Sequence, residues 1–209
     1  MKKSLICLGI ILTAIVAAIA LPYSPMLIES LSAQTQSIAE RIKEGDVIFH
    51  TSTSSQSPLI QIGTRSKITH CGIIVMRDGK PYVLETRRTL VLTPLDQFIA
   101  RGVDGKYWIK RSDKENIKIN YAKYLGKRYD SAFSFDNDIY YCSELVYDIY
   151  LKQLGIQLCE PKRVGDYLVL GTSHLPIIQE TLKNRGITLE QYAVAPVDIF
   201  NSEHLKSVK

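Results

Sequence analysis

A cysteine and a histidine in this sequence have the residue types of a nucleophile and its base. Cys142 lies in Tyr141-Cys142-Ser143-Glu144, which opens an apolar run with helical spacing, and His70 opens a β-branched apolar run earlier in the chain. A thiol at a helix N-terminus is favoured as the thiolate, because unpaired backbone N–H groups and the positive end of the helix dipole lie there. A histidine within reach can take up the proton and return it to a leaving group, so the pair is the minimum equipment of a cysteine hydrolase.

Glu85 is the candidate third member, because a predicted hairpin brings it near His70. The Asp78-Gly79 dipeptide predicts a tight turn between two apolar strands. Side chains alternate between the two faces of a strand, so His70 and Glu85 share one face as diagonal neighbours while Cys71 points to the other. A carboxylate behind a histidine fixes its tautomer and orientation, as in serine triads. The expected register places Val75 opposite Tyr82, Ile73 opposite Leu84, and Gly72 opposite Glu85.

Each member of this trio also has an ordinary structural interpretation. A cysteine at the start of a buried helix is by default a small core residue. A strand histidine is more often structural, and Glu85 could be a solvated strand residue. The hairpin geometry favours the catalytic interpretation, because His70 and Glu85 fall on one face without having been selected for it. If Cys142 is the nucleophile, its own backbone N–H at the helix terminus is a natural oxyanion donor.

The other histidines and a pair of arginines carry weaker signals. His50 follows an apolar strand and could line a cleft, but nothing in the sequence singles it out. His174 lies in a polar loop and His204 in a polar C-terminal segment, where exposed histidines are the ordinary case. Arg87 and Arg88 could contact an anionic substrate, although solvated charges at a sheet edge are the favoured interpretation.

Hydrophobic patterning predicts an α+β domain, with strands clustered centrally and helices on both sides. Gly126 and Gly155 are natural helix stops. The predicted strands cover residues 47–49, 70–76, 82–86, 107–109 and 192–194. The predicted helices cover residues 58–62, 94–100, 121–125, 142–154 and 176–184.

The first residues have the pattern of an export signal. Lys2 and Lys3 precede an uncharged apolar run over residues 5–21, and residues 18–20 offer a small-x-small cleavage site. An uncleaved membrane anchor is the alternative, although the run falls just short of the roughly 20 residues of a spanning helix. We expect an exported protein of the periplasm or cell envelope. The expected segments are a signal peptide or anchor at 1–20, a lead-in at 21–43, one hydrolase domain at 44–200 and a polar tail at 201–209.

Composition excludes some partners and leaves others open. The 209 residues are 45% hydrophobic, which is enough for one real core. The formal charge of +5 falls to +3 if residues 1–20 are removed with their two lysines, and no concentrated basic stripe indicates nucleic-acid binding. Without residues 1–20 three cysteines remain, so at least one thiol is unpaired by any internal disulfide. A Cys71–Cys159 bridge is left open, as is the oligomeric state. No C-x-x-C or H-x-x-E-H spacing occurs, so no metal and no other cofactor is expected.

Four sequence blocks, in their order along the chain, resemble the YiiX-like hydrolases. These hydrolases are circularly permuted members of the papain-like NlpC superfamily, and the resemblance runs from about residue 44 to residue 200. Histidine precedes cysteine here, as the permutation requires. The resemblance implies a permuted papain-like α+β fold with a central antiparallel sheet or small barrel flanked by helices. The blocks are Gly45-Asp46-Val47-Ile48-Phe49, His70-Cys71-Gly72-Ile73, Leu84-Glu85-Thr86 and Tyr141-Cys142-Ser143-Glu144-Leu145-Val146.

The resemblance also implies roles for particular residues. Cys142 is the implied nucleophile, His70 the base and Glu85 the orienting residue. Tyr129 matches a tyrosine that assists the oxyanion hole in superfamily relatives, with Tyr140 and Tyr141 as nearby rivals.

Three functional hypotheses follow. The first is an exported thiol hydrolase that cleaves an amide bond in a cell-wall peptide or amino-acid conjugate through an acyl-enzyme. The second, implied by related permuted members, is a lipid thioesterase or acyltransferase, which apolar access to Cys142 would favour. The third is a non-catalytic envelope binding module, which predicts an unreactive Cys142. Membrane association would involve residues 5–21.

Overall fold

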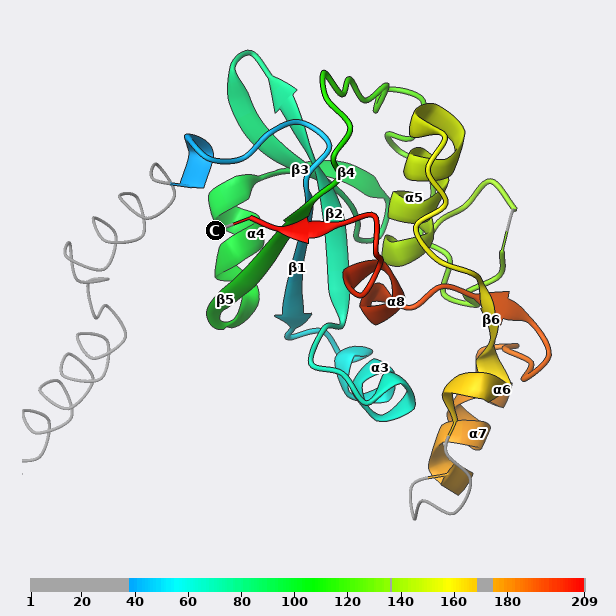
Figure 1. The fold of residues 1–209 in the computed structure, drawn as a ribbon. Helices are drawn as coiled ribbons and strands as arrows, with labels where there is room; N and C mark the ends of the chain where they lie inside the picture. Colours follow the sequence, from blue (N-terminus) through cyan, green and yellow to red (C-terminus); the bar gives the residue numbers. More distant parts are fainter. Residues whose placement is uncertain (1–37, 136, 169–174, 209) are drawn as a thin grey trace, which may run out of the picture. The chain divides into compact units, whose positions relative to one another are not determined.

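The computed structural model describes residues 38–208, except residues 136 and 169–174. The expectations for the signal or anchor, for nearly all of the lead-in segment and for His174 lie outside the described residues. Residues 38–209 form one compact unit, whose elements are drawn in Figure 1. Within the described residues no helix is both long and apolar enough to span a bilayer.

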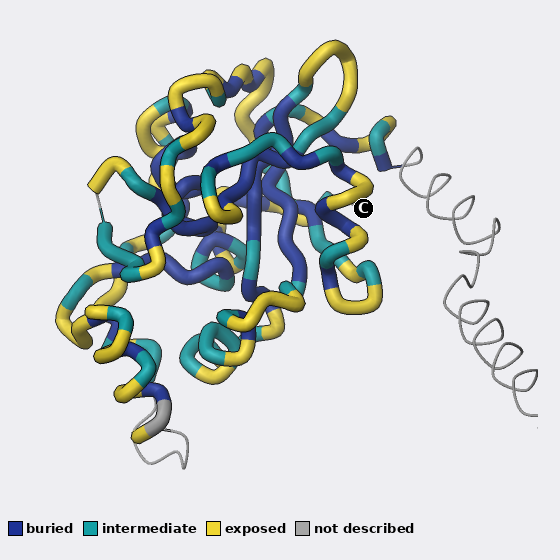
Figure 2. Tube along the Cα trace, turned by 180° about the vertical axis from the view of Figure 1, so that it is seen from behind, coloured by how far each residue is buried: buried dark blue, intermediate teal, exposed yellow. Residues whose placement is uncertain are grey.

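The centre of this unit is a six-stranded antiparallel sheet with the strand order β4-β3-β2-β1-β5-β8. The sheet is open, so of the two expected arrangements the flanked sheet is confirmed and the small barrel is not. Its central strands are buried along most of their length (Figure 2). The strands are β1 (Val47–Ser52), β2 (His70–Arg77), β3 (Lys80–Thr86), β4 (Leu90–Pro94), β5 (Gly102–Arg111) and β8 (Lys206–Ser207).

The β2–β3 hairpin has the predicted register, with Ile73 opposite Leu84 and Val75 opposite Tyr82. Asp78 and Gly79 both adopt positive φ angles, of 51° and 73°, as a two-residue turn matching the twist of the strands requires. In β2, a Cβ on Gly72 would lie 2.4 Å from Val83 Cγ1 and 2.8 Å from the Leu84 carbonyl oxygen of β3. Glycine at this position therefore allows the backbones to meet beside His70.

Helices cover both faces of the sheet, and the strand residues alternate between them. On one face α5 (Cys142–Ile149) packs against β2 and β3, with Phe49, Ile73 and Leu84 beneath it. On the other face α4 (Leu95–Ala100) covers Ile48 and other strand residues. After α5 the chain continues as the π-helical segment η1 (Tyr150–Leu154), which ends at Gly155 with a φ of 69°. The predicted helix over 142–154 is thus present, although its last turn is wider than an α-helix.

A smaller apolar cluster, here called the C-terminal cluster, lies beside the N-terminus of α5. Its elements are α3 (Ser57–Thr64), β6 (Lys162–Arg163), α6 (Val164–Tyr167), α7 (Leu175–Asn184) and β7 (Tyr192–Ala193). The last helix, α8 (Pro196–Phe200), packs instead on the main core through Ile199. Strands β6 and β7 form a two-stranded sheet of their own. The buried members of the cluster are Tyr141, Val164, Ile178, Leu182, Ile187 and Ala193.

Two sequence expectations about elements differ from the structure. The predicted helix over 121–125 is a run of turns, because its amides bond three residues back, as Tyr124 N to Tyr121 O at 3.0 Å. It leaves the helical path where the Gly126 N–H donates to Leu90 O at 2.9 Å. The segment expected as a polar tail carries β8, which pairs with Lys110 and Arg111 of β5. Its buried Leu205 explains why it joins the unit.

Candidate active site

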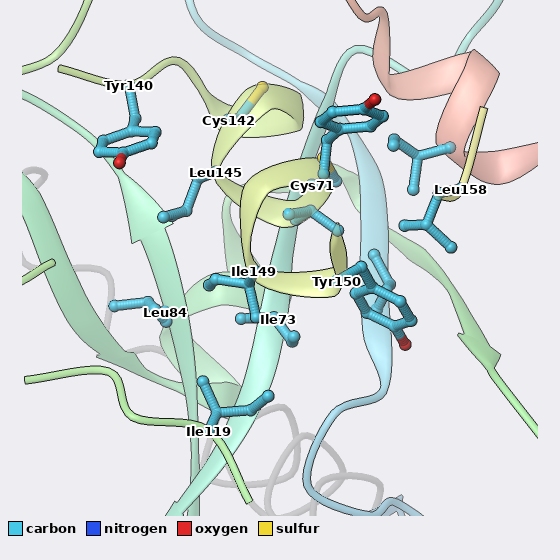
Figure 3. Close-up of a cluster of buried hydrophobic side chains, with 14 of the residues drawn as sticks. Cys71, Ile73, Leu84, Ile119, Tyr140, Cys142, Leu145, Ile149, Tyr150 and Leu158 are labelled. Atoms are coloured by element: carbon cyan, nitrogen blue, oxygen red, sulfur yellow. The ribbon is translucent and has the colours of Figure 1, made fainter. Parts of the chain in front are cut away.

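Cys142 is the first residue of α5, directly after Tyr141 in extended conformation at the N-cap. The Leu145 N–H donates to the Tyr141 carbonyl at 3.0 Å, which closes the first turn and leaves the amides before it without helical acceptors. The thiol lies at this end of the helix with Cys71 of β2 beneath it (Figure 3). Cys142 is only 6% exposed. The structure therefore places the predicted nucleophile at a helix N-terminus, close to the sheet.

His70 and Glu85 meet on the predicted face of the hairpin. His70 Nε2 lies 2.7 Å from Glu85 Oε2, and the Glu85 side chain is fully buried. Since Nε2 is engaged by the carboxylate, Nδ1 is the ring nitrogen left to face Cys142, whose charge and hydrogen bonding raise the pKa of His70. The structure thus brings the three predicted residues together.

Two residues that the sequence reasoning missed hold Glu85 in place. Thr93 Oγ1 donates to Glu85 Oε1 at 2.5 Å, and Arg101 Nη2 donates to the same oxygen. Burial raises the pKa of Glu85, but the hydrogen bond and charge of His70, together with Thr93 and Arg101, lower it overall. Glu85 is therefore a carboxylate at neutral pH with all of its partners in place.

The surroundings of Cys142 and His70 favour the charged form of both side chains. A hydrogen bond from Cys71 lowers the pKa of Cys142, burial raises it, and the charge and hydrogen bond of His70 bring it well below the ordinary thiol value. Burial lowers the pKa of His70, but the negative charge on Cys142 and the bonds to Cys142 and Glu85 raise it to about 9. A thiolate beside an imidazolium is the reactive form of such a pair.

Cys71 takes part in this site through its thiol. Burial and the hydrogen bond to Cys142 raise the pKa of Cys71 well above its ordinary value. It therefore stays protonated and donates its S–H to the Cys142 thiolate. Cys71, Cys142 and Cys159 are all free thiols in the structure.

Removing the Cys71 donor should make Cys142 less reactive. A hydrogen bond to a charged group contributes roughly 1.5–3 kcal/mol, so Cys71→Ala should slow alkylation of Cys142 at mildly acidic pH by about tenfold or more. Cys71→Ser is the matched control, because a serine hydroxyl can donate to the same sulfur. Iodoacetamide labelling followed by peptide mapping measures the rate at Cys142 alone. Identical pH dependence in Cys71→Ala and wild type would show that this bond does not hold the Cys142 pKa low.

His50, which no sequence pattern singles out, lies directly beside His70. The two residues pair across β1 and β2, and their rings stack with centroids 5.3 Å apart. The ring of Phe98 stacks on His50 in turn, at 4.4 Å. Burial, with the positive charges of His70 and Arg101, lowers the pKa of His50 to about 3. His50 is therefore a neutral ring that supports His70 without competing for its proton.

The three tyrosines considered for the oxyanion hole have different surroundings. Tyr129 lines a cavity together with Cys142, and its hydroxyl donates to Gln56 Oε1 at 2.6 Å. Tyr141 lines the same cavity, but its hydroxyl accepts the Val194 N–H at 2.9 Å. Tyr140 packs in the main core against the Tyr124 ring. Tyr129 is thus a neighbour of Cys142 whose hydroxyl is already bonded to Gln56, whereas the Cys142 N–H lies in the first turn of α5, where amides have no helical acceptor.

The remaining sequence candidates within the described residues have exposed side chains. Arg87 and Arg88 are exposed, as the solvated interpretation expected. His204 is also largely exposed, near Glu203. In the part of the chain that the structure describes, no three His, Cys, Asp or Glu side chains are grouped so as to hold a metal ion.

A cysteine at the N-terminus of a helix packed on an antiparallel sheet, with its histidine earlier in the chain, defines a cysteine hydrolase of the permuted papain-like class. The chain belongs to the permuted papain-like amidase family YaeF/YiiX, C92, whose family model matches residues 41–209. It is 35% identical over 193 residues to the uncharacterized protein YiiX of Escherichia coli K12, covering 88% of this chain and 94% of that protein. It is also similar to a crystal structure described as metalloprotein YiiX from Escherichia coli O157:H7. That match has 37% identity and a TM-score of 0.72, and covers 81% of this chain and 97% of the other.

Proposed function

We propose that Cys142, His70 and Glu85 form a catalytic triad that hydrolyses an amide bond through an acyl-enzyme. The observation that carries this proposal is the geometry of the site: Cys142 begins α5, and His70 Nε2 lies 2.7 Å from the buried Glu85 carboxylate. The charge of His70 lowers the pKa of Cys142, and the charge of Cys142 raises that of His70, which supports the pairing. Membership of an amidase family supports the amide as the bond that is cut. An isolated core cysteine would need none of these partners.

The chemistry of this triad has two halves. The Cys142 sulfur attacks the carbonyl carbon, and the Cys142 N–H stabilises the oxyanion that forms. His70 gives its proton to the departing amine as the C–N bond breaks, which leaves a thioester on Cys142. A water molecule then attacks the thioester, His70 takes its proton, and the carboxylic acid leaves with the thiolate restored. Glu85 keeps the imidazole oriented throughout.

The expected location and substrate remain part of the proposal. Export rests on the charged and apolar pattern of residues 1–21, and it would bring the enzyme to cell-wall peptides or amino-acid conjugates. The lipid thioesterase or acyltransferase is a second candidate with the same thiol. It is favoured by one specific observation, the predominantly apolar cavity beside Cys142.

A related YiiX structure is described as a metalloprotein, which raises the question of a metal in this chain. Its described side chains include no cluster of three or more metal-binding groups. Cys142, His70 and Glu85 are instead bonded to one another and to Cys71, Thr93 and Arg101.

The pH dependence of Cys142 alkylation tests the triad. In the wild type, iodoacetamide should react rapidly from well below the ordinary thiol pKa, because the thiolate is already present. In His70→Ala the alkylation rate should depend on pH as it does for an ordinary thiol, with a pKa of about 8.5 or above. Hydrolysis by the wild type should fall as the pH rises through about 9, because His70 then loses the proton that the amine needs.

Peptide mapping separates Cys142 from Cys71 and Cys159 in this experiment, and His204→Ala is the control for loss of a histidine. Wild-type Cys142 titrating like an ordinary thiol, or never reacting, would contradict the triad. The binding-module hypothesis would then account for the fold.

A further inference from the structure

A cavity of about 110 Å³ has Cys142 in its wall. A single buried water needs only about 10–15 Å³, so the space accepts a group of several heavy atoms. Its wall is formed by α3, the start of α5, α6, α7 and the residues between β7 and α8. The side chains that dominate it are Leu59, Ile60, Val164, Ile178, Leu182 and Val194. The cavity is therefore predominantly apolar, and Cys142 forms part of its wall.

The hydroxyl groups in the wall are already bonded within the protein. Tyr129 donates to Gln56 at 2.6 Å, and Ser143 Oγ donates to Val194 O at 2.6 Å. Thr64 Oγ1 donates to Ile60 O at 2.7 Å. A polar occupant would lose its bonds to water without replacing them, which is unfavourable. An aliphatic occupant would instead gain by leaving water.

The position of His70 decides which part of a substrate enters the cavity. The leaving amine must lie beside His70, because it takes its proton from that residue. Cys142 lines the cavity, whereas His70 and Glu85 do not. The part of the substrate that stays on the sulfur as the thioester is therefore the part that the cavity can hold.

We propose that this cavity is an acyl-binding pocket, and that the substrate is an amine or amino acid acylated with an aliphatic chain. The proposal rests on Cys142 being the nucleophile, as proposed above, and it names the substrate class of that same site. The aliphatic acyl chain lies between α3 and α7, and the amine leaves on the side of His70. An ester or thioester of the same acyl group would place its chain in the same pocket.

Alkanals test the pocket without requiring turnover. An aldehyde R–CHO adds the Cys142 thiolate to its carbonyl carbon and takes a proton at oxygen, which gives a reversible thiohemiacetal with R in the acyl position. The measurement is protection of Cys142 from iodoacetamide by the series from ethanal to decanal. Protection should strengthen roughly fourfold for each added methylene until the pocket is full, since each buried methylene contributes about 0.8 kcal/mol.

Two variants on α3 form a matched pair for this test. Ile60→Trp fills the pocket. It should abolish the increase of protection with chain length, while protection of Cys142 by ethanal should stay unchanged. Ile62→Trp makes the same change at a residue that is 41% exposed and outside the wall. In this variant the alkanals should protect Cys142 as they do in the wild type. Gly63→Leu is a second blocking variant, because a Cβ there meets no atom within 4 Å.

The outcomes separate this proposal from the triad on which it rests. If wild-type Cys142 reacts readily with iodoacetamide but ethanal and decanal protect it equally, the acyl pocket is overturned and the triad stands. Equal loss of long-chain protection in Ile60→Trp and Ile62→Trp would also overturn the pocket. If Cys142 does not react at all, the triad itself fails.

Discussion

Cys142→Ser is expected to lower turnover by at least about 10³-fold, because a serine hydroxyl beside His70 is far less ionised than the present thiolate. The substitution should also lower the pKa of His70 from about 9, since the negative charge on Cys142 is the largest influence that raises it. NMR titration of the imidazole measures that shift independently of any substrate. The protein should stay folded, because serine is close to cysteine in size.

The control for this substitution is Cys159→Ser, at a half-buried thiol outside the hydrogen-bonded row. It should leave both turnover and the His70 titration unchanged. An unaltered His70 pKa in Cys142→Ser would show that the two side chains do not form the ion pair described here. Undiminished turnover would require a different nucleophile.

Glu85→Ala is expected to destabilise the protein by about 3–5 kcal/mol, because it removes one partner of a buried charge network. Arg101, Thr93 and His70 would lose their common acceptor. Glu85→Gln keeps the size and most of the bonds, so its cost should be smaller, although turnover should fall in both variants. Urea unfolding at neutral pH measures the difference, with Glu203→Ala at an exposed carboxylate as the control.

Acid unfolding gives a second measure of the same residue. The folded-state pKa of Glu85 lies below its ordinary value of 4.5. Its contribution to stability is therefore complete above that value and is lost as the pH falls through the lowered pKa. In Glu85→Gln, this part of the acid-induced loss of stability should be absent. If the free energy of unfolding falls equally with pH in the wild type and in Glu85→Gln, the partners of the Glu85 carboxylate do not stabilise its ionised form.

The parts of the site that depend on short-range sequence patterns could be predicted from the sequence. Asp78-Gly79 fixes the turn, the turn fixes the register, and the register brings His70 to Glu85. The position of Cys142 at a helix terminus follows equally from the apolar run behind it. Each of these inferences depends on a few neighbouring residues.

The rest of the site depends on pairings between distant segments. His50 reaches His70 only through the β1–β2 register, and Thr93 reaches Glu85 through the β3–β4 register. Arg101 follows α4, and no short-range pattern links it to Glu85. The sequence pattern at 121–125 predicts a helix, but hydrogen bonds between the following residues and Leu90, which is distant in the sequence, end the segment as turns.

Apart from Cys142, which they share, the proposed triad and the proposed acyl pocket draw on separate parts of the molecule. His70 and Glu85 belong to the central sheet, whereas most of the pocket wall comes from the C-terminal cluster, with its own small core. Substitutions at Val164, Ile178 or Leu182 can therefore reshape the pocket without moving the reacting atoms. Selectivity can diverge within the family while the catalytic residues stay fixed. A comparison of these wall positions among relatives would thus sort them by substrate more finely than overall identity does.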